Sequence, residues 1–102
     1  MSRSDMCHLK VTVQREGEDA ENTPRVLYDE KPEGWITEWQ ISTARKYLWQ
    51  SLGGGLYTQP EPVDVAFSPD KRTQIVRFSV WESRSGTTTW RVEMNEGGRL
   101  WK

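Results

Sequence analysis

The chain has 102 residues, 14 of them Lys or Arg and 15 Asp or Glu, so its formal net charge is −1 at pH 7. That balance argues against a basic domain that binds polyanions and against electrostatic attachment to an anionic membrane. Cys7 is the only cysteine, which excludes an intrachain disulfide. The length predicts one domain over residues 1–102, and no apolar run is long enough for a signal peptide or a membrane span, so we expect a soluble cytoplasmic protein.

The N-terminal part of the chain predicts two strands. Residues 7–13 alternate between apolar and polar, which is the period of a strand with one buried face. On such a strand Cys7 is expected on the buried face and His8 on the exposed face. Residues 15–23 are acidic and aperiodic, which indicates an exposed loop, and residues 26–28 predict a short second strand.

The middle of the chain predicts a third strand and one helix. Residues 35–41 fit a strand with period two, although a helical interpretation of the same run stays open. Ser42 is a good N-cap, so a helix is expected over residues 42–52. The glycines at 53–55 are a stop signal for that helix. The side chains expected to contact the sheet are Ala44, Leu48 and Leu52, with Tyr47 or Trp49 at the edge.

The C-terminal half predicts a four-stranded meander. Residues 63–67 and 73–83 flank Ser68-Pro69-Asp70-Lys71, which has the chemistry of a type I turn. A three-residue loop at 84–86, with glycine last, leads to a strand over 87–94, and a glycine turn at 96–98 leads to a strand over 99–101. These loops predict the cross-strand pairs Val63–Val76, Val80–Trp90, Phe78–Val92, Val76–Met94 and Met94–Leu100, and an Arg77–Glu93 ion pair on the reverse face.

These elements predict an α+β fold, a mostly antiparallel curved sheet of six to seven short strands with one main helix packed on one face. The face assigned to the core carries Val76, Phe78, Val80, Trp90, Val92 and Met94.

The residues offer little for catalysis. Cys7 and His8 are adjacent, and neighbours on a strand point to opposite faces, so they cannot act as a nucleophile and its base. The carboxylates lie in loops without metal-binding spacing. The glycines at 53–55 follow a helix, whereas a phosphate loop precedes one. We therefore expect no enzymatic activity, no cofactor and no metal site.

The reverse face of the meander is the predicted binding surface. It carries Ile75, Trp81 and Trp101 as an apolar centre, with a charged rim of Arg77, Arg91 and Glu93. Trp and Arg are the residues most enriched at interface hot spots, so we expect a protein partner, with homodimerisation as one form of it. The C-terminal strand is a second candidate, as an edge open to strand addition. The alternative is that other elements cover these side chains as core.

The helix followed by a meander ending in Asn-Glu-Gly-Gly-Arg-Leu-Trp resembles the cystatin-like and nuclear-transport-factor-like cone folds over the last half of the chain. That resemblance implies a ligand pocket between helix and sheet, in a small-ligand-binding or enzymatic domain, and no site residue is carried over from it. Basic and aromatic side chains such as Arg45, Lys46, Tyr47 and Trp49 leave single-stranded nucleic-acid binding as a further alternative.

The first expectation is thus a non-catalytic interaction or modulator protein that acts through a Trp/Arg sheet face. Small stand-alone proteins of this kind are common in phages and mobile elements, where they bind host machinery.

Overall fold

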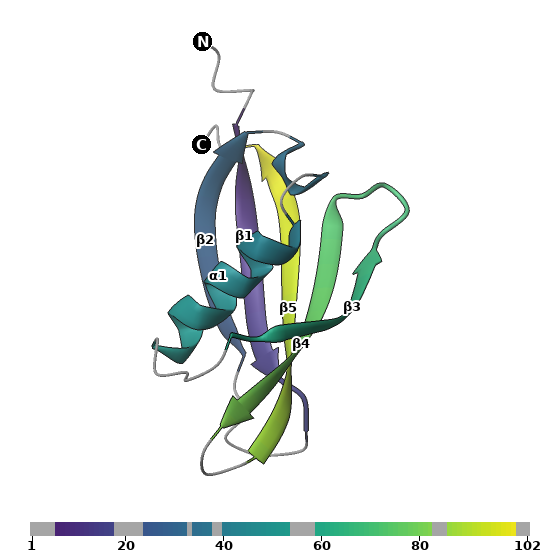
Figure 1. Ribbon diagram of the computed structural model, residues 1–102. Coiled ribbons are helices and arrows are strands. Elements are labelled where there is room, and N and C mark those ends of the chain that lie inside the picture. The colour runs from purple at the N-terminus through teal and green to yellow at the C-terminus, as the bar shows by residue number, and fades with distance from the viewer. Residues whose placement is uncertain are drawn as a thin grey trace.

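The computed structural model describes residues 6–17, 24–32, 34–37, 40–53, 59–82 and 86–99. Within them, an antiparallel sheet of five strands carries one main helix on one face (Figure 1). The predicted α+β class is confirmed, with five strands in place of six to seven. In chain order the elements are β1 (Met6–Arg15), β2 (Arg25–Pro32), the 3-10 helix η2 (Trp35–Thr37), α1 (Gln40–Leu52), β3 (Glu61–Phe67), β4 (Thr73–Glu82) and β5 (Gly86–Arg99). No helix in the described part of the chain is long and apolar enough to span a membrane.

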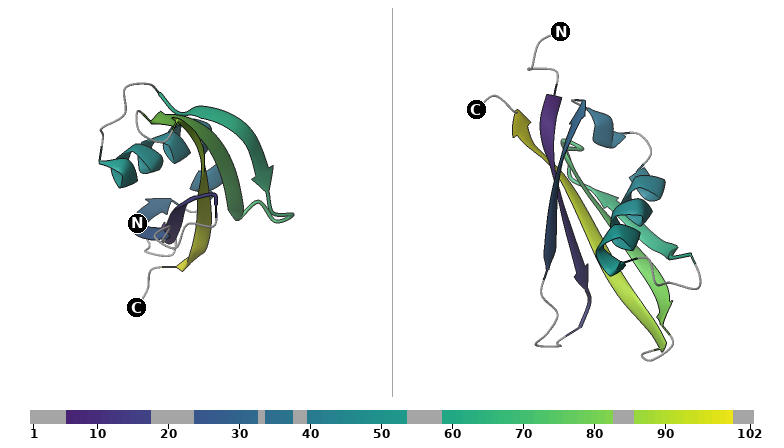
Figure 2. Two further views of the ribbon diagram at one scale, coloured as in Figure 1. Left: turned by 90° about the horizontal axis from the view of Figure 1, so that it is seen from below. Right: turned by 90° about the vertical axis from the view of Figure 1, so that its left-hand side faces the viewer.

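The strands lie in the order β2-β1-β5-β4-β3. The β1–β2 hairpin joins the other three strands through β1 and β5, where Val11 pairs with Met94 and Val13 with Val92. The sheet curls around α1 (Figure 2). β5 lies between β1 and β4, whereas we expected the C-terminal strand at an edge. The two edges are β2 and β3.

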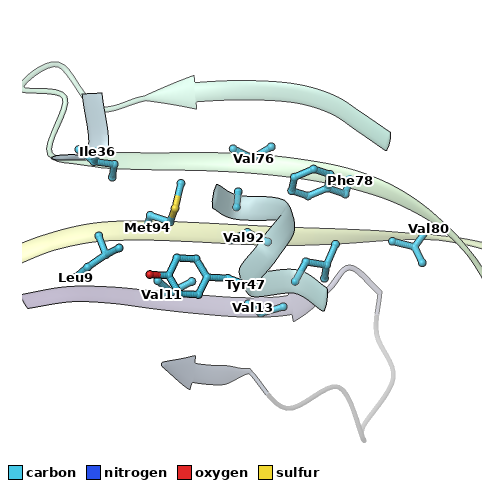
Figure 3. Packing of buried hydrophobic residues seen from close by; sticks show 12 residues of the cluster. Leu9, Val11, Val13, Ile36, Tyr47, Val76, Phe78, Val80, Val92 and Met94 are labelled. Carbon is cyan, nitrogen blue, oxygen red and sulfur yellow. The ribbon is translucent and has the colours of Figure 1, made fainter. Parts of the chain in front are cut away.

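The core lies between α1 and the sheet face that α1 covers, which we call the inner face (Figure 3). α1 packs on β1, β4 and β5. The predicted core face is confirmed, because Val76, Phe78, Val80, Val92 and Met94 are buried and Trp90 is partly buried against them. The helix contacts are confirmed as well, since Ala44 and Leu48 are buried and Leu52 is partly buried. Cys7 is buried and His8 exposed, as expected.

The predicted strand over residues 35–41 is wrong. Residues 35–37 form η2, and α1 begins at Gln40, two residues before the expected N-cap at Ser42. Gly34 adopts a positive φ of 79°, which turns the chain after β2 and places Ile36 in the core. The Gly34 amide donates to the buried Glu96 carboxylate at 2.8 Å. The alternating pattern left this conformation ambiguous, and in the structure Ile36 reaches the core from a 3-10 helix.

The β4–β5 register differs from the predicted one by two residues. Val80 lies opposite Thr88, Phe78 opposite Trp90 and Val76 opposite Val92, because Gly86 is the strand partner of Glu82 and not a loop residue. A shift of two keeps every side chain on its predicted face. The predicted Arg77–Glu93 pair is wrong, since Arg77 lies opposite Arg91.

The turn before β4 forms as predicted, with a 2.9 Å bond from the Lys71 amide to the Ser68 carbonyl. The connection is nevertheless longer, because Lys71 has φ of 58° and the Ser68 amide bonds to the Thr73 carbonyl. Val65, and not Val63, therefore lies opposite Val76.

The predicted glycine turn at 96–98 is a β-bulge instead. Leu9 pairs with Glu96 and Cys7 with Arg99, so β5 runs on alongside β1 with one extra residue opposite His8. A Cβ atom at Gly97 would lie 3.7 Å from the His8 carbonyl oxygen, an ordinary van der Waals contact, so the space at the bulge does not itself require glycine. Leu100 lies outside the described residues.

Candidate binding surfaces

The outer face, which we define as the sheet face opposite α1, is not covered by any described element (Figure 2). Four of the five residues predicted for binding lie on it, since they alternate along β4 and β5 with inner-face residues: Ile75, Arg77, Trp81 and Arg91. Trp101, the fifth, lies outside the described residues. The structure thus brings the predicted β4 and β5 positions together on one exposed surface.

Charged side chains occupy the middle of the outer face. Arg77 Nε donates to Glu16 Oε2 at 2.7 Å, and its Nη1 donates to Asp64 Oδ2 at 2.7 Å. Arg91 donates to Glu93 on its own strand at 3.0 Å. A shallow hollow beside these groups is lined by Gln14, Arg15, Glu16, Gly17 and Arg91.

The two carboxylates explain how Arg77 lies directly opposite Arg91. The hydrogen bonds that Arg77 donates to Glu16, followed by the one it donates to Asp64, raise the pKa of Arg77, and the bond from Arg77 lowers the pKa of Glu16. The β1 end and β3 thus supply the negative charge that we expected from Glu93. This charge arrangement fixes the Arg77 guanidinium in one place.

Trp81 lies at the end of this face, two strand positions beyond Ser79 and opposite Thr87. Its side chain is 47% exposed, so it is not a core residue. Ile75 is only partly exposed, and Arg77 and Ser79 separate it from Trp81 on the same face. Among the described residues, the outer face therefore differs from the expected apolar centre with a charged rim. The centre is charged, and the exposed aromatic ring lies at one end.

A second surface was not predicted. All seven residues of β3 are exposed, and its large apolar side chains are 38–55% exposed. Val65 and Phe67 pair with Val76 and Gln74, so they point to the inner face. α1 lies over the neighbouring strands and leaves β3 open (Figure 1).

The helix adds two side chains to this surface. Ile41, Arg45 and Trp49 follow each other at four-residue spacing and share one side of α1. That side faces β3, because Arg45 Nε donates to the carbonyl of Pro60 at 3.0 Å, whereas Tyr47 on the opposite side donates to Asp29 of β2 at 2.9 Å. Ile41 and Trp49 are both exposed. We call the combined surface the β3 flank; it comprises Ile41, Trp49, Val63, Val65 and Phe67.

The β3 flank contains five of the eight large apolar side chains that are exposed in the described residues. The sequence held a signal for it, in the alternation of Val63, Val65 and Phe67. The predicted Val63–Val76 pair put that alternation on the same face as the core residues of β4. The pattern gives the face of a strand, but it does not show how many strands one helix can cover.

The chemically reactive groups form no catalytic arrangement in the described residues. Cys7 Sγ lies 3.6 Å from Glu96 Oε2 in the core, and His8 points to the opposite side of β1. The described part of the chain holds no group of three or more His, Cys, Asp or Glu side chains placed to bind a metal.

Comparisons of the chain with protein-family models, with curated proteins and with solved structures find no match. The functional proposals below therefore rest on the geometry of this molecule.

Proposed function

We propose that the protein is a non-catalytic interaction protein that binds another protein through the outer face of its sheet. The observation that carries the proposal is the 47% exposure of Trp81 on a sheet face without a covering element among the described residues. Trp is the side chain most often found to dominate binding energy, and it gains most when a partner removes its ring from water.

The surroundings of Trp81 support binding to a protein. Ser79, Thr87 and Thr89 present short hydroxyl side chains on the same face, and Arg77 is held between two carboxylates. A rigid aromatic ring beside small hydrogen-bonding groups is the chemistry of a paratope. Because these groups lie on paired strands, little conformational entropy is lost when a partner binds.

The charges on this face favour a protein over a nucleic acid. A phosphate backbone is bound by Lys and Arg side chains whose charge is not already neutralised. Arg77 is bonded to Glu16 and Asp64, and Arg91 to Glu93. A partner with mixed charge fits this surface. The narrower expectation, a modulator of host machinery from a phage or mobile element, rests on size and composition.

Capture from an extract of the native host, with mass spectrometry of what is retained, tests the proposal. Trp81→Ala is expected to reduce affinity for the captured protein by at least about 30-fold, the effect of a hot spot of about 2 kcal/mol or more. Trp49→Ala is the matched control, because its ring is exposed to a similar degree on the helix.

Both variants are expected to keep the thermal transition of the wild type within a few degrees. Unchanged affinity for Trp81→Ala, or equal losses in both variants, contradicts binding through the outer face.

A further inference from the structure

We propose that the β3 flank is a self-association surface, on which β3 pairs antiparallel with β3 of a second copy of this chain. The β3 flank shares no residue with the outer face, so a result that contradicts one of the two proposals does not contradict the other. Among the described strands, β3 is an edge strand with one side unpaired, and each of its residues is exposed. An edge of this kind with apolar side chains is a template for another strand.

The other edge strand, β2, is protected against pairing with a strand of another chain. β2 carries Asp29, Glu30 and Lys31, with a 3.1 Å ion pair between Lys31 and Asp29. Charged side chains and ion pairs protect an edge. On β3, Pro62 and a bulge before Asp64 interrupt the first half of the strand. The stretch that stays open runs from Val63 to Phe67.

The sequence of this stretch is self-complementary. An antiparallel pair centred on Val65 sets Val65 opposite its own copy and Val63 opposite Phe67 of the second copy. Asp64 then lies opposite Ala66, whereas a centre at Asp64 would place two carboxylates against each other. These features identify the occupant as this chain itself.

The helices complete the interface. An antiparallel strand pair has a two-fold axis perpendicular to the sheet, so both inner faces, and both copies of α1, lie on the same side of the joined sheet. Val65 and Phe67 of both copies then line the floor between the two helices. Ile41 and Trp49 point into this space, because Arg45 between them reaches toward the start of β3. One assembly thus covers all five members of the β3 flank.

The experiment measures mass in solution by sedimentation equilibrium, up to sub-millimolar protein. The wild type is expected at twice the 11.9 kDa of one chain. Val65→Lys is expected to remain a monomer over the same range, because two lysines would meet at the two-fold axis. Trp81→Ala, on the outer face, is expected to stay dimeric. A monomeric wild type, or a dimeric Val65→Lys, overturns the proposal.

A cross-link tests the register without depending on a disruptive variant. Residues directly opposite in an antiparallel pair have Cα atoms about 4.5–5.5 Å apart, within the range that a disulfide spans. Val65→Cys is therefore expected to form a disulfide-linked dimer on mild oxidation. Wild type, with Cys7 buried, and Ala66→Cys, which faces Asp64, are expected not to link. Linking of Ala66→Cys alone, or of neither variant, contradicts pairing at Val65.

Discussion

The side chain of Gln74 is the clearest energetic defect in the described core. It is 0% exposed on the inner face, with Met94 opposite it on β5 and Phe67 opposite it on β3. Neither its amide nitrogen nor its amide oxygen has a hydrogen-bond partner. A buried polar group without a partner costs about 1–3 kcal/mol, because the bond to water is lost and not replaced.

Gln74→Met is therefore expected to raise the free energy of unfolding by about 1–3 kcal/mol. Methionine is unbranched and close in volume to glutamine, so the exchange removes the amide with little repacking. For a domain of about 100 residues, each kcal/mol raises the midpoint of thermal unfolding by about 4–8 °C.

Urea unfolding followed by tryptophan fluorescence measures the effect, with the slope of free energy against denaturant expected to stay unchanged. Gln74→Ala is the control, because it also removes the amide but leaves a cavity, so it is expected to be less stable than Gln74→Met. A Gln74→Met variant less stable than wild type by about 1 kcal/mol or more would show that the amide is satisfied and refute the reasoning.

Two further predictions concern the core and its link to β2. Phe78→Ala is expected to lower the free energy of unfolding by about 3–5 kcal/mol in the same urea assay, because the Phe78 ring is fully buried. A loss of stability below about 1 kcal/mol would contradict the place of Phe78 in the core. Tyr47→Phe removes the bond to Asp29 and is expected to cost about 1 kcal/mol at neutral pH, at the low end because the Asp29 side chain is 44% exposed. Burial raises the pKa of Asp29, but the hydrogen bonds from Lys31 and Tyr47 together lower it by more, so the folded-state pKa lies below the ordinary Asp value. The stabilisation by the Tyr47–Asp29 bond is therefore fully present above the ordinary Asp pKa, and it is lost as the pH falls through the folded-state pKa. A cost that stays constant in unfolding measurements down to acid pH argues against the carboxylate as the acceptor.

The position of the candidate site on the sheet could be predicted in part. The alternation along β4 placed Ile75, Arg77 and Trp81 on one face, and they share it. The ion pairing of Arg77 could not be predicted. Glu16 follows β1 and Asp64 lies on β3, on either side of β4 in the strand order, and only that order brings both carboxylates to Arg77. The exposure of Trp81 also required the structure, because it depends on which face α1 covers.

The sequence by itself determined which side chains share a face. Successive side chains on a strand point to opposite sides, a property of covalent geometry that holds in any register, so Val76, Phe78 and Val80 lie with Val92 and Met94 although the pairing differs by two residues. The sequence also determined the Ser68–Lys71 turn, because Pro69 restricts the backbone locally.

Only the tertiary structure decided which strands are neighbours and which edge is open. The pairing of β1 with β5 joins residues near opposite ends of the chain, and no local pattern specifies such a contact. It makes β5 central, turns the Gly97-Gly98 pair from a hairpin into a bulge, and leaves β3 at the edge beyond the reach of α1. The same alternation of Val65 and Phe67 would be core under a wider helical layer. Under a single helix it forms the exposed β3 flank, because burial depends on what packs above a strand as well as on the strand itself.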